Sequence, residues 1–157
     1  MGYVGIHKKD EFTLSELIKS IKANLDFNRT GAIATFVGVV RSTSLQGENV
    51  EGLEIEAYEE QANKVLGSIC KDLKKLKGIV DVQIHHFVGK FSVGEDLVYV
   101  AVAGEHRENI FTVLQEAVER YKKETPIFKK EYIVDEEGVK ESYWVSEREA
   151  HQKRGSQ

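Results

Sequence analysis

Residues 31–40 read Gly31-Ala-Ile-Ala-Thr-Phe-Val-Gly-Val-Val40 and are apolar almost throughout. An uninterrupted apolar run of this length is typical of a strand that is covered on both faces. The run ends at Arg41, and the polar loop 42–47 follows it. A second run, Leu97-Val-Tyr-Val-Ala-Val102, has the same character. Both runs therefore predict buried strands.

The segments around these two runs alternate between helical and strand patterns. Thr13-Leu14-Ser15-Glu16 has the form of a capping box, in which side chains satisfy the first N–H groups of a helix. Apolar spacing predicts two further helices, and Pro126 must lie beyond the end of the last one. The pattern predicts an α+β fold with about three helices and leaves the strand order open. One predicted helix begins at residue 14, and the other two cover 62–76 and 110–121. The predicted strands cover 3–6, 31–40, 53–58, 80–85, 97–102, 128–134 and 142–145, with connections over 89–94 and 135–138.

Length and composition limit the possible functions. The 157 residues suffice for one domain, which we place at residues 1–145, and the polar residues 146–157 are expected to form a mobile tail. With 22 basic and 26 acidic residues, the net charge of −4 excludes a chain-wide basic surface for nucleic acid. The sequence has no membrane-length apolar run and no signal-peptide pattern at its start, so we expect a cytoplasmic protein without a membrane partner.

Metal and thiol chemistry is also disfavoured. The single cysteine, Cys70, cannot form an internal disulfide or a multi-thiolate metal site. The five histidines lack the spacing of metal ligands. His85 and His86 are neighbours on a predicted strand, so their side chains should point to opposite faces. We therefore expect no bound metal.

The stretch Arg120-Tyr-Lys-Lys-Glu-Thr-Pro-Ile-Phe-Lys-Lys-Glu131 is locally positive, with five basic and two acidic residues. Lys122 falls in the last turn of a predicted helix, and Lys129 falls on an extended segment beyond the proline. A sharp break between helix and strand can direct both lysines into one pocket. Alternation places Lys129 and Glu131 on one face of that segment and Lys130 on the other. In a simpler interpretation, the lysines only stabilise the carboxyl end of the helix.

Two further places are candidates for anion binding. His106-Arg107 stand where a predicted strand gives way to a helix, and helix N-termini attract anions. Arg41 ends an apolar strand, where its guanidinium can form paired hydrogen bonds to a phosphate or carboxylate. Simpler interpretations exist for both. Arg107 can pair with a surface carboxylate, and an arginine at a strand end often only solvates that end.

Taken together and in chain order, these segments resemble one family, the large catalytic subunit of molybdopterin synthase. The likeness runs from about residue 30 to residue 145. Any one motif is weak evidence, whereas the ordered set is specific. The matching segments are Gly31–Arg41, Leu53–Tyr58, His86–Gly89, Gly94-Glu95, His106-Arg107 and Lys122 followed by Lys129–Glu131.

The resemblance implies a fold, an assembly and a reaction. The family has an α/β hammerhead-type fold and forms a homodimer within a heterotetramer. Each large subunit binds a small ubiquitin-like sulfur-carrier subunit that ends in a Gly-Gly thiocarboxylate. Sulfur passes from that carrier to cyclic pyranopterin monophosphate (precursor Z), which yields the dithiolene of molybdopterin in molybdenum cofactor biosynthesis. No cofactor is implied.

The resemblance also implies roles for particular residues. Lys122 and Lys129 match the family's catalytic lysines. One departure concerns charge, because Phe87 stands where the family often has arginine. The positions that match the family's substrate pocket are Val39, Val40, Arg41, His106, Arg107, Lys130 and Glu131.

Two alternatives from other functional classes remain open at this stage. A non-catalytic module that binds a ubiquitin-like tail or a phosphorylated metabolite would present the same basic spot. Product formation from precursor Z and a thiocarboxylated partner would separate that module from an enzyme. Single-stranded nucleic acid binding would need aromatic and basic residues interleaved on one sheet face. The acidic total charge argues against the nucleic-acid alternative.

Overall fold

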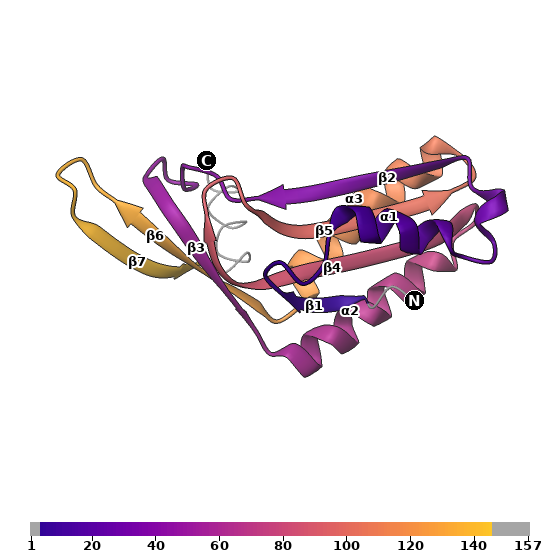
Figure 1. Ribbon diagram of the computed structural model, residues 1–157, viewed down its shortest axis with the longest axis horizontal. Coiled ribbons are helices and arrows are strands. Elements are labelled where there is room, and N and C mark those ends of the chain that lie inside the picture. Colours follow the sequence, from indigo (N-terminus) through magenta and orange to yellow (C-terminus); the bar gives the residue numbers. More distant parts are fainter. Residues whose placement is uncertain (1–3, 146–157) are drawn as a thin grey trace.

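Residues 4–145 are described by the computed structural model, in which helices separate consecutive pairs of strands along the chain (Figure 1). The described strands form one sheet in the order β2-β5-β4-β3-β6-β7, and β1 pairs in parallel with β4. The α+β prediction is confirmed; the predicted tail, 146–157, lies outside the described residues. The elements are β1 (Gly5–Lys8), α1 (Leu14–Lys22), η1 (Phe27–Arg29), β2 (Ala32–Val39), β3 (Asn49–Ala57), α2 (Glu59–Lys74), β4 (Ile79–Ser92), β5 (Asp96–Gly104), α3 (Arg107–Glu124), β6 (Ile127–Val134) and β7 (Lys140–Val145).

Strand β4 joins two parts of the sheet. Up to His86 it pairs with β5, and from Gly89 onward it pairs with β3. Figure 1 shows β3, β6 and β7 extending as an arm from the part that contains β2 and β5. Gly89 has φ +131, which residues with a side chain rarely adopt, and it lets the strand bend between the two parts. The predicted connection over 89–94 is therefore wrong, because the strand continues to Ser92.

Strand β2 differs from its prediction. It lies at one end of the sheet and, among residues 4–145, pairs along one side only, with β5. All of its residues are half-buried or exposed, so the expectation of a strand covered on both faces is wrong for the single chain. The apolar run identified the strand but could not show that one of its edges is unpaired. A long apolar edge strand is the kind of surface that another chain usually covers.

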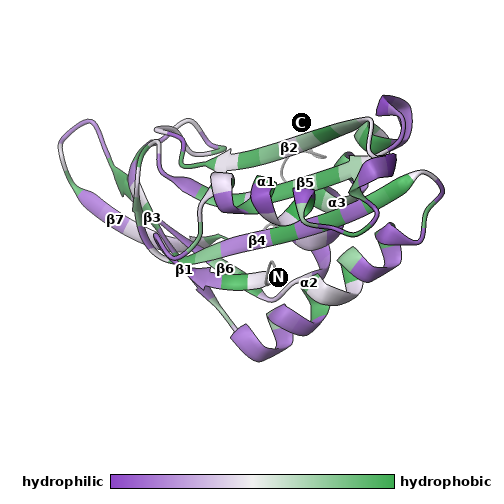
Figure 2. Ribbon diagram, turned by 45° about the vertical axis from the view of Figure 1, so that its right-hand side comes forward, coloured by the Kyte–Doolittle hydropathy of each residue, from purple (hydrophilic) through white to green (hydrophobic). Residues whose placement is uncertain are grey.

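Two apolar cores hold the sheet between helices. One core lies between the sheet and the helices α2 and α3, and the other lies beneath α1 and continues into the arm. Figure 2 shows hydrophobic residues along β2 and β5 and hydrophilic residues on the outer side of α2. The predicted capping box is confirmed: the Thr13 hydroxyl accepts a hydrogen bond from the Glu16 N–H at 3.1 Å, and the Glu16 carboxylate accepts one from the Thr13 N–H at 2.9 Å.

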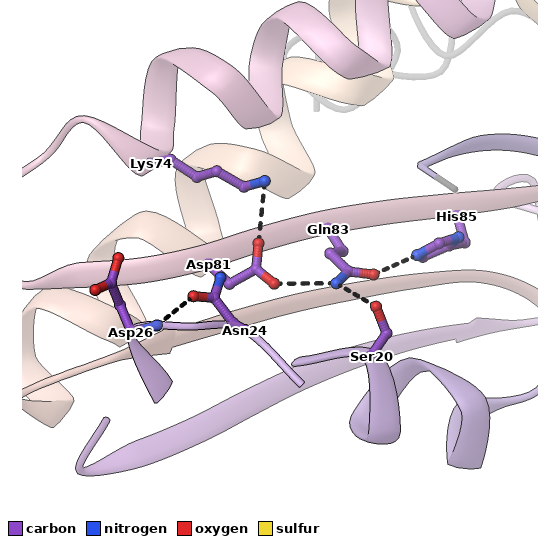
Figure 3. Close-up of polar contacts among 7 residues, drawn as sticks. All are labelled: Ser20, Asn24, Asp26, Lys74, Asp81, Gln83 and His85. Carbon is purple, nitrogen blue, oxygen red and sulfur yellow. Dashed lines mark hydrogen bonds and ion pairs between the residues drawn. The ribbon is translucent and has the colours of Figure 1, made fainter. Parts of the chain in front are cut away.

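A row of buried polar side chains runs along β4 beneath α1 (Figure 3). The ammonium of Lys74 lies 3.1 Å from Asp81 Oδ1. Gln83 Nε2 donates to Asp81 Oδ2 at 3.0 Å and to Ser20 Oγ at 3.1 Å. His85 Nε2 donates to Gln83 Oε1 at 2.8 Å. Asp81, Gln83 and His85 therefore each have at least one hydrogen-bond partner, and Asp81 Oδ1 is balanced by its ion pair with Lys74.

His85 is held neutral at the end of this row. Its Nδ1 lies 2.8 Å from His7 Nε2, and because Nε2 of His85 already carries the proton, Nδ1 is the acceptor. Burial, and secondarily the charge of His7, lower the pKa of His85 to about 3. His86 faces the other side of the sheet and contacts Tyr121, so the prediction of opposite faces is confirmed.

The His85 environment predicts an acid-sensitive fold. In the unfolded chain a histidine takes up its proton near pH 6.5, whereas native His85 does not, so stability is full above pH 6.5 and falls as the pH drops toward 3. The loss is at most about 1.4 kcal/mol per pH unit. We expect the free energy of unfolding, measured in urea between pH 6.5 and 5, to fall less steeply for His85→Gln. His106→Gln, at an exposed site, is the matched control. Equal slopes for wild type and His85→Gln would contradict this account.

Candidate functional site

A narrow cavity of about 100 Å³ lies where the end of α3 meets β6. Both lysines singled out by the sequence, Lys122 and Lys129, line this cavity, which we call the lysine cavity. They come from different elements, one from the last turn of α3 and the other from β6. The remaining lining residues come from β2, β3, β4, β5, α3, β6, the end of β7 and the link between α3 and β6. They are Phe36, Gly38, Ile55, His86, Leu97, Tyr121, Thr125, Ile127 and Val145.

The break between α3 and β6 brings the two lysines together. Helix α3 ends at Glu124, and Thr125 has extended backbone angles, as expected for a residue before proline. Strand β6 begins directly after Pro126, and its alternation turns Ile127 and Lys129 toward the cavity. Lys122 is exposed and Lys129 is half-buried in the single chain. Two ammonium groups at one small cavity make it a place for an anion.

The other wall of the cavity is made of residues that sequence reasoning did not select. The His86 ring lies edge-on to Tyr121, with 5.8 Å between their centroids, and His86 Nδ1 donates to the Phe87 carbonyl at 3.0 Å. Gly38 has no room for a side chain, because an added Cβ would lie 2.6 Å from Val98 Cγ1. The period-2 pattern of β4 could have placed His86 on this face, whereas nothing in the pattern singles out Thr125.

Gly38 lines the cavity, and the next three residues of the chain, Val39, Val40 and Arg41, do not. Val39 is 47% exposed, and Arg41 is exposed as well. Val40 is only 2% exposed and packs in the core beneath α1. The Val40 side chain therefore does not line this cavity in the single chain.

Lys130 and Glu131 leave β6 on opposite faces. Lys130 is on the outer face of the arm, where its ammonium lies over the rings of Tyr132 and Trp144 at 5.8 and 5.5 Å from their centroids. Glu131 is buried and accepts a hydrogen bond from the Tyr143 hydroxyl at 3.0 Å. Burial and the Glu131 charge raise the pKa of Tyr143 to about 12. The predicted alternation is confirmed, and it turns Lys130 away from the face that carries Lys129.

His106 and Arg107 lie at the opposite end of α3 from Lys122. The helix has 18 residues, so its ends are about 27 Å apart at 1.5 Å per residue. Both residues are exposed beside the carboxyl end of β5. One chain therefore brings Lys122 and Lys129 together and keeps His106 and Arg107 apart from them.

The described residues also bear on metal binding and on membrane insertion. Within residues 4–145, no three side chains of His, Cys, Asp or Glu gather as a metal ion would require. The helices in the same range are all too short or too polar to cross a bilayer.

Comparison with known proteins identifies relatives of this chain. The profile of the family described as MoaE protein matches residues 7–124. The chain is 34% identical over 140 residues to the molybdopterin synthase catalytic subunit of Pyrococcus abyssi, a match that covers 89% of this chain and 88% of that one. It is 36% identical over 137 residues to a probable molybdopterin synthase of Haloferax volcanii. That match covers 87% of this chain, which spans about half (51%) of the longer relative.

Solved structures share the fold. The crystal structure of molybdopterin synthase from Staphylococcus aureus superposes with a TM-score of 0.76 at 30% identity, covering 92% of this chain and 98% of that one. A complex of subunits 1 and 2 of molybdopterin-converting factor from Helicobacter pylori contains a chain with a TM-score of 0.66 at 24% identity, covering 83% and 84%. At that identity the second likeness concerns the fold alone.

Proposed function

The chain belongs to the MoaE family, and from this membership we propose its reaction. Relatives of the chain are molybdopterin synthase catalytic subunits. The protein catalyses the transfer of sulfur from the C-terminal thiocarboxylate of a small ubiquitin-like subunit to cyclic pyranopterin monophosphate. In each transfer the substrate gains a carbon–sulfur bond, the carrier's carbon–sulfur bond breaks, and the addition of water leaves the carrier as a carboxylate; two transfers build the dithiolene of molybdopterin. A small-subunit partner agrees with the two-subunit composition of the Helicobacter pylori complex.

One observation carries the proposal: Lys122 and Lys129 line one narrow cavity in a chain whose net charge is −4. A thiocarboxylate is an anion, and two ammonium groups favour it where the rest of the protein would repel it. Pockets that hold whole small molecules measure about 300–1,000 Å³. The 100 Å³ found here suits the last atoms of an extended tail. The tail's carbonyl carbon would then lie beside Lys122, with Lys129 stabilising the charge that develops during transfer.

We propose further that the working unit contains two copies of this chain. Arg107 precedes Lys122 by fifteen residues of α3, which is about 23 Å along the helix axis, so a single copy cannot place all these residues around one substrate. The unpaired apolar edge of β2 is a surface that a second copy can cover. In such a dimer, the His106-Arg107 end of one copy approaches the lysine cavity of the other. Two large and two small subunits make a heterotetramer.

The remaining predicted residues take roles in binding the substrate. Arg41 and Arg107 supply charge-assisted hydrogen bonds to the cyclic phosphate. Lys130 stays a predicted phosphate contact that a single copy does not bring to the lysine cavity, because its ammonium lies over the rings of Tyr132 and Trp144. His106 orients the substrate or carries a proton. Val39 is exposed, whereas Val40 and Glu131 are buried in the single chain; all three stay predicted substrate-pocket positions. Phe87, at the position where the family often has arginine, is buried against Tyr99 and carries no charge to the site.

The proposal is tested by reconstitution. The purified chain, a small subunit with a Gly-Gly thiocarboxylate and precursor Z are combined, and the dithiolene product is followed by oxidation to a fluorescent pterin. We expect product that depends on all three components and amounts to one molybdopterin for every two thiocarboxylates consumed. Tight binding of the small subunit without any product would instead identify a non-catalytic binding module.

A further inference from the structure

Among the described residues that line the lysine cavity, Thr125 is the one with a buried side-chain atom that lacks a hydrogen-bond partner. It is only 8% exposed, and it lies between the two elements that carry Lys122 and Lys129. Its backbone is satisfied, because its N–H donates to the Tyr121 carbonyl at 3.2 Å and its carbonyl accepts from the Ile127 N–H at 2.8 Å. Its hydroxyl oxygen, in contrast, is buried and has no hydrogen-bond partner among residues 4–145.

An unpaired buried hydroxyl lowers stability, since the group has lost its water and gained nothing in return. Valine has the same branched shape and would fill the same space without that cost. The position immediately before a proline needs an extended backbone, which β-branched residues adopt readily, but it has no need of a hydroxyl. Because Thr125 lines the lysine cavity, a polar group that enters the cavity can supply the missing hydrogen-bond partner.

We propose that the Thr125 hydroxyl binds the terminal oxygen of the sulfur carrier's C-terminal thiocarboxylate; this inference rests on the proposed function. Lys122 and Lys129 attract the anionic terminus but, as flexible ammonium groups, do not fix its orientation. A hydroxyl on a short, stiff side chain does. Oxygen is a better hydrogen-bond acceptor than sulfur, so the hydroxyl selects the oxygen of the thiocarboxylate. The sulfur is thereby turned toward the side from which the substrate approaches.

The test compares Thr125→Val, which removes the hydroxyl and keeps the shape, with Thr125→Ser, which keeps the hydroxyl. The probes are the small subunit ending in a Gly-Gly carboxylate and the same subunit lacking both glycines. Affinities are measured by titration calorimetry, and thermal unfolding is recorded for each variant. We expect Thr125→Val to bind the intact small subunit about tenfold more weakly than wild type, as for loss of a hydrogen bond to a charged group. Thr125→Ser should bind within about twofold of wild type.

Two further results separate this role from a structural one. Thr125→Val should unfold at the same temperature as wild type or higher, because it loses an unsatisfied polar group. With the truncated small subunit, wild type and Thr125→Val should bind equally. If Thr125→Val binds the intact subunit as tightly as wild type does, or loses equal affinity for the truncated one, Thr125 does not contact the terminus. If wild type itself does not distinguish intact from truncated subunit, the proposed function and this inference both fail.

Discussion

Replacing Lys122 by Ala is expected to stop dithiolene formation while leaving the fold and the binding of the small subunit intact. Lys122 is exposed and lies in the last turn of α3, where alanine is an excellent helix former, so little stability is lost. The cavity, however, loses the ammonium closest to the proposed position of the thiocarboxylate carbon. Loss of such a group typically lowers the rate by about 10²–10⁴-fold. Single-turnover formation of product, measured with saturating thiocarboxylated partner, tests this expectation.

Lys123→Ala is the matched control for this experiment. Lys123 is the next residue of the same helical turn, is equally exposed and does not line the cavity. We expect Lys123→Ala to retain activity within about twofold of wild type, as is usual for a surface substitution. Near-normal turnover by Lys122→Ala would remove Lys122 from the mechanism. Equal losses in both variants would indicate that only the general positive charge of the helix end matters.

The second large effect is expected from mixing two inactive variants. Arg107→Ala and Lys122→Ala lie at opposite ends of α3, and each should be inactive when it forms a dimer with itself. If one site uses Arg107 of one copy and Lys122 of the other, a mixed dimer contains one complete site and one doubly defective site. Random pairing makes half of the dimers mixed, so activity should return to about a quarter of wild type.

Co-expression of the two variants with different affinity tags, followed by purification through both tags, isolates the mixed dimers and raises the expected recovery to about half. A mixture of Lys122→Ala with Lys129→Ala is the control, because both lysines line the same cavity of one chain and no complete site can form. Absence of recovery in the Arg107 mixture, or a chain that stays monomeric in light scattering, would contradict the shared site.

Much of the lysine cavity could be predicted from sequence because it depends on local rules. Pro126 must end α3, and a strand that begins directly after it alternates its side chains, so Lys129 had to leave β6 on the face opposite to Lys130. These two rules place Lys122 and Lys129 on either side of one break. The capping box at Thr13 and the hairpin over 135–138 followed from equally local patterns.

The features that sequence reasoning missed depend on distant parts of the chain. An apolar run cannot tell a central strand from β2, whose second edge is unpaired, because the difference lies in the neighbours and not in the run. Glycine occurs both in loops and at bends within a strand, so Gly89 was predicted to begin a loop. In the structure it instead marks the point where β4 bends between the two parts of the sheet. Helix length alone gives the distance between Arg107 and Lys122, but the sequence does not show whether one site combines residues of two copies.

The aromatic pair that flanks Lys130 gives the protein a built-in optical probe. Trp144 is the only tryptophan among the 157 residues, and it lies on β7 with 49% of its surface exposed. All indole fluorescence of this chain therefore originates from the arm, next to a cation that sits 5.5 Å above the ring. Emission excited at the red edge of the absorption band reports on that one location without any label. A partner that has no tryptophan can be titrated against it directly.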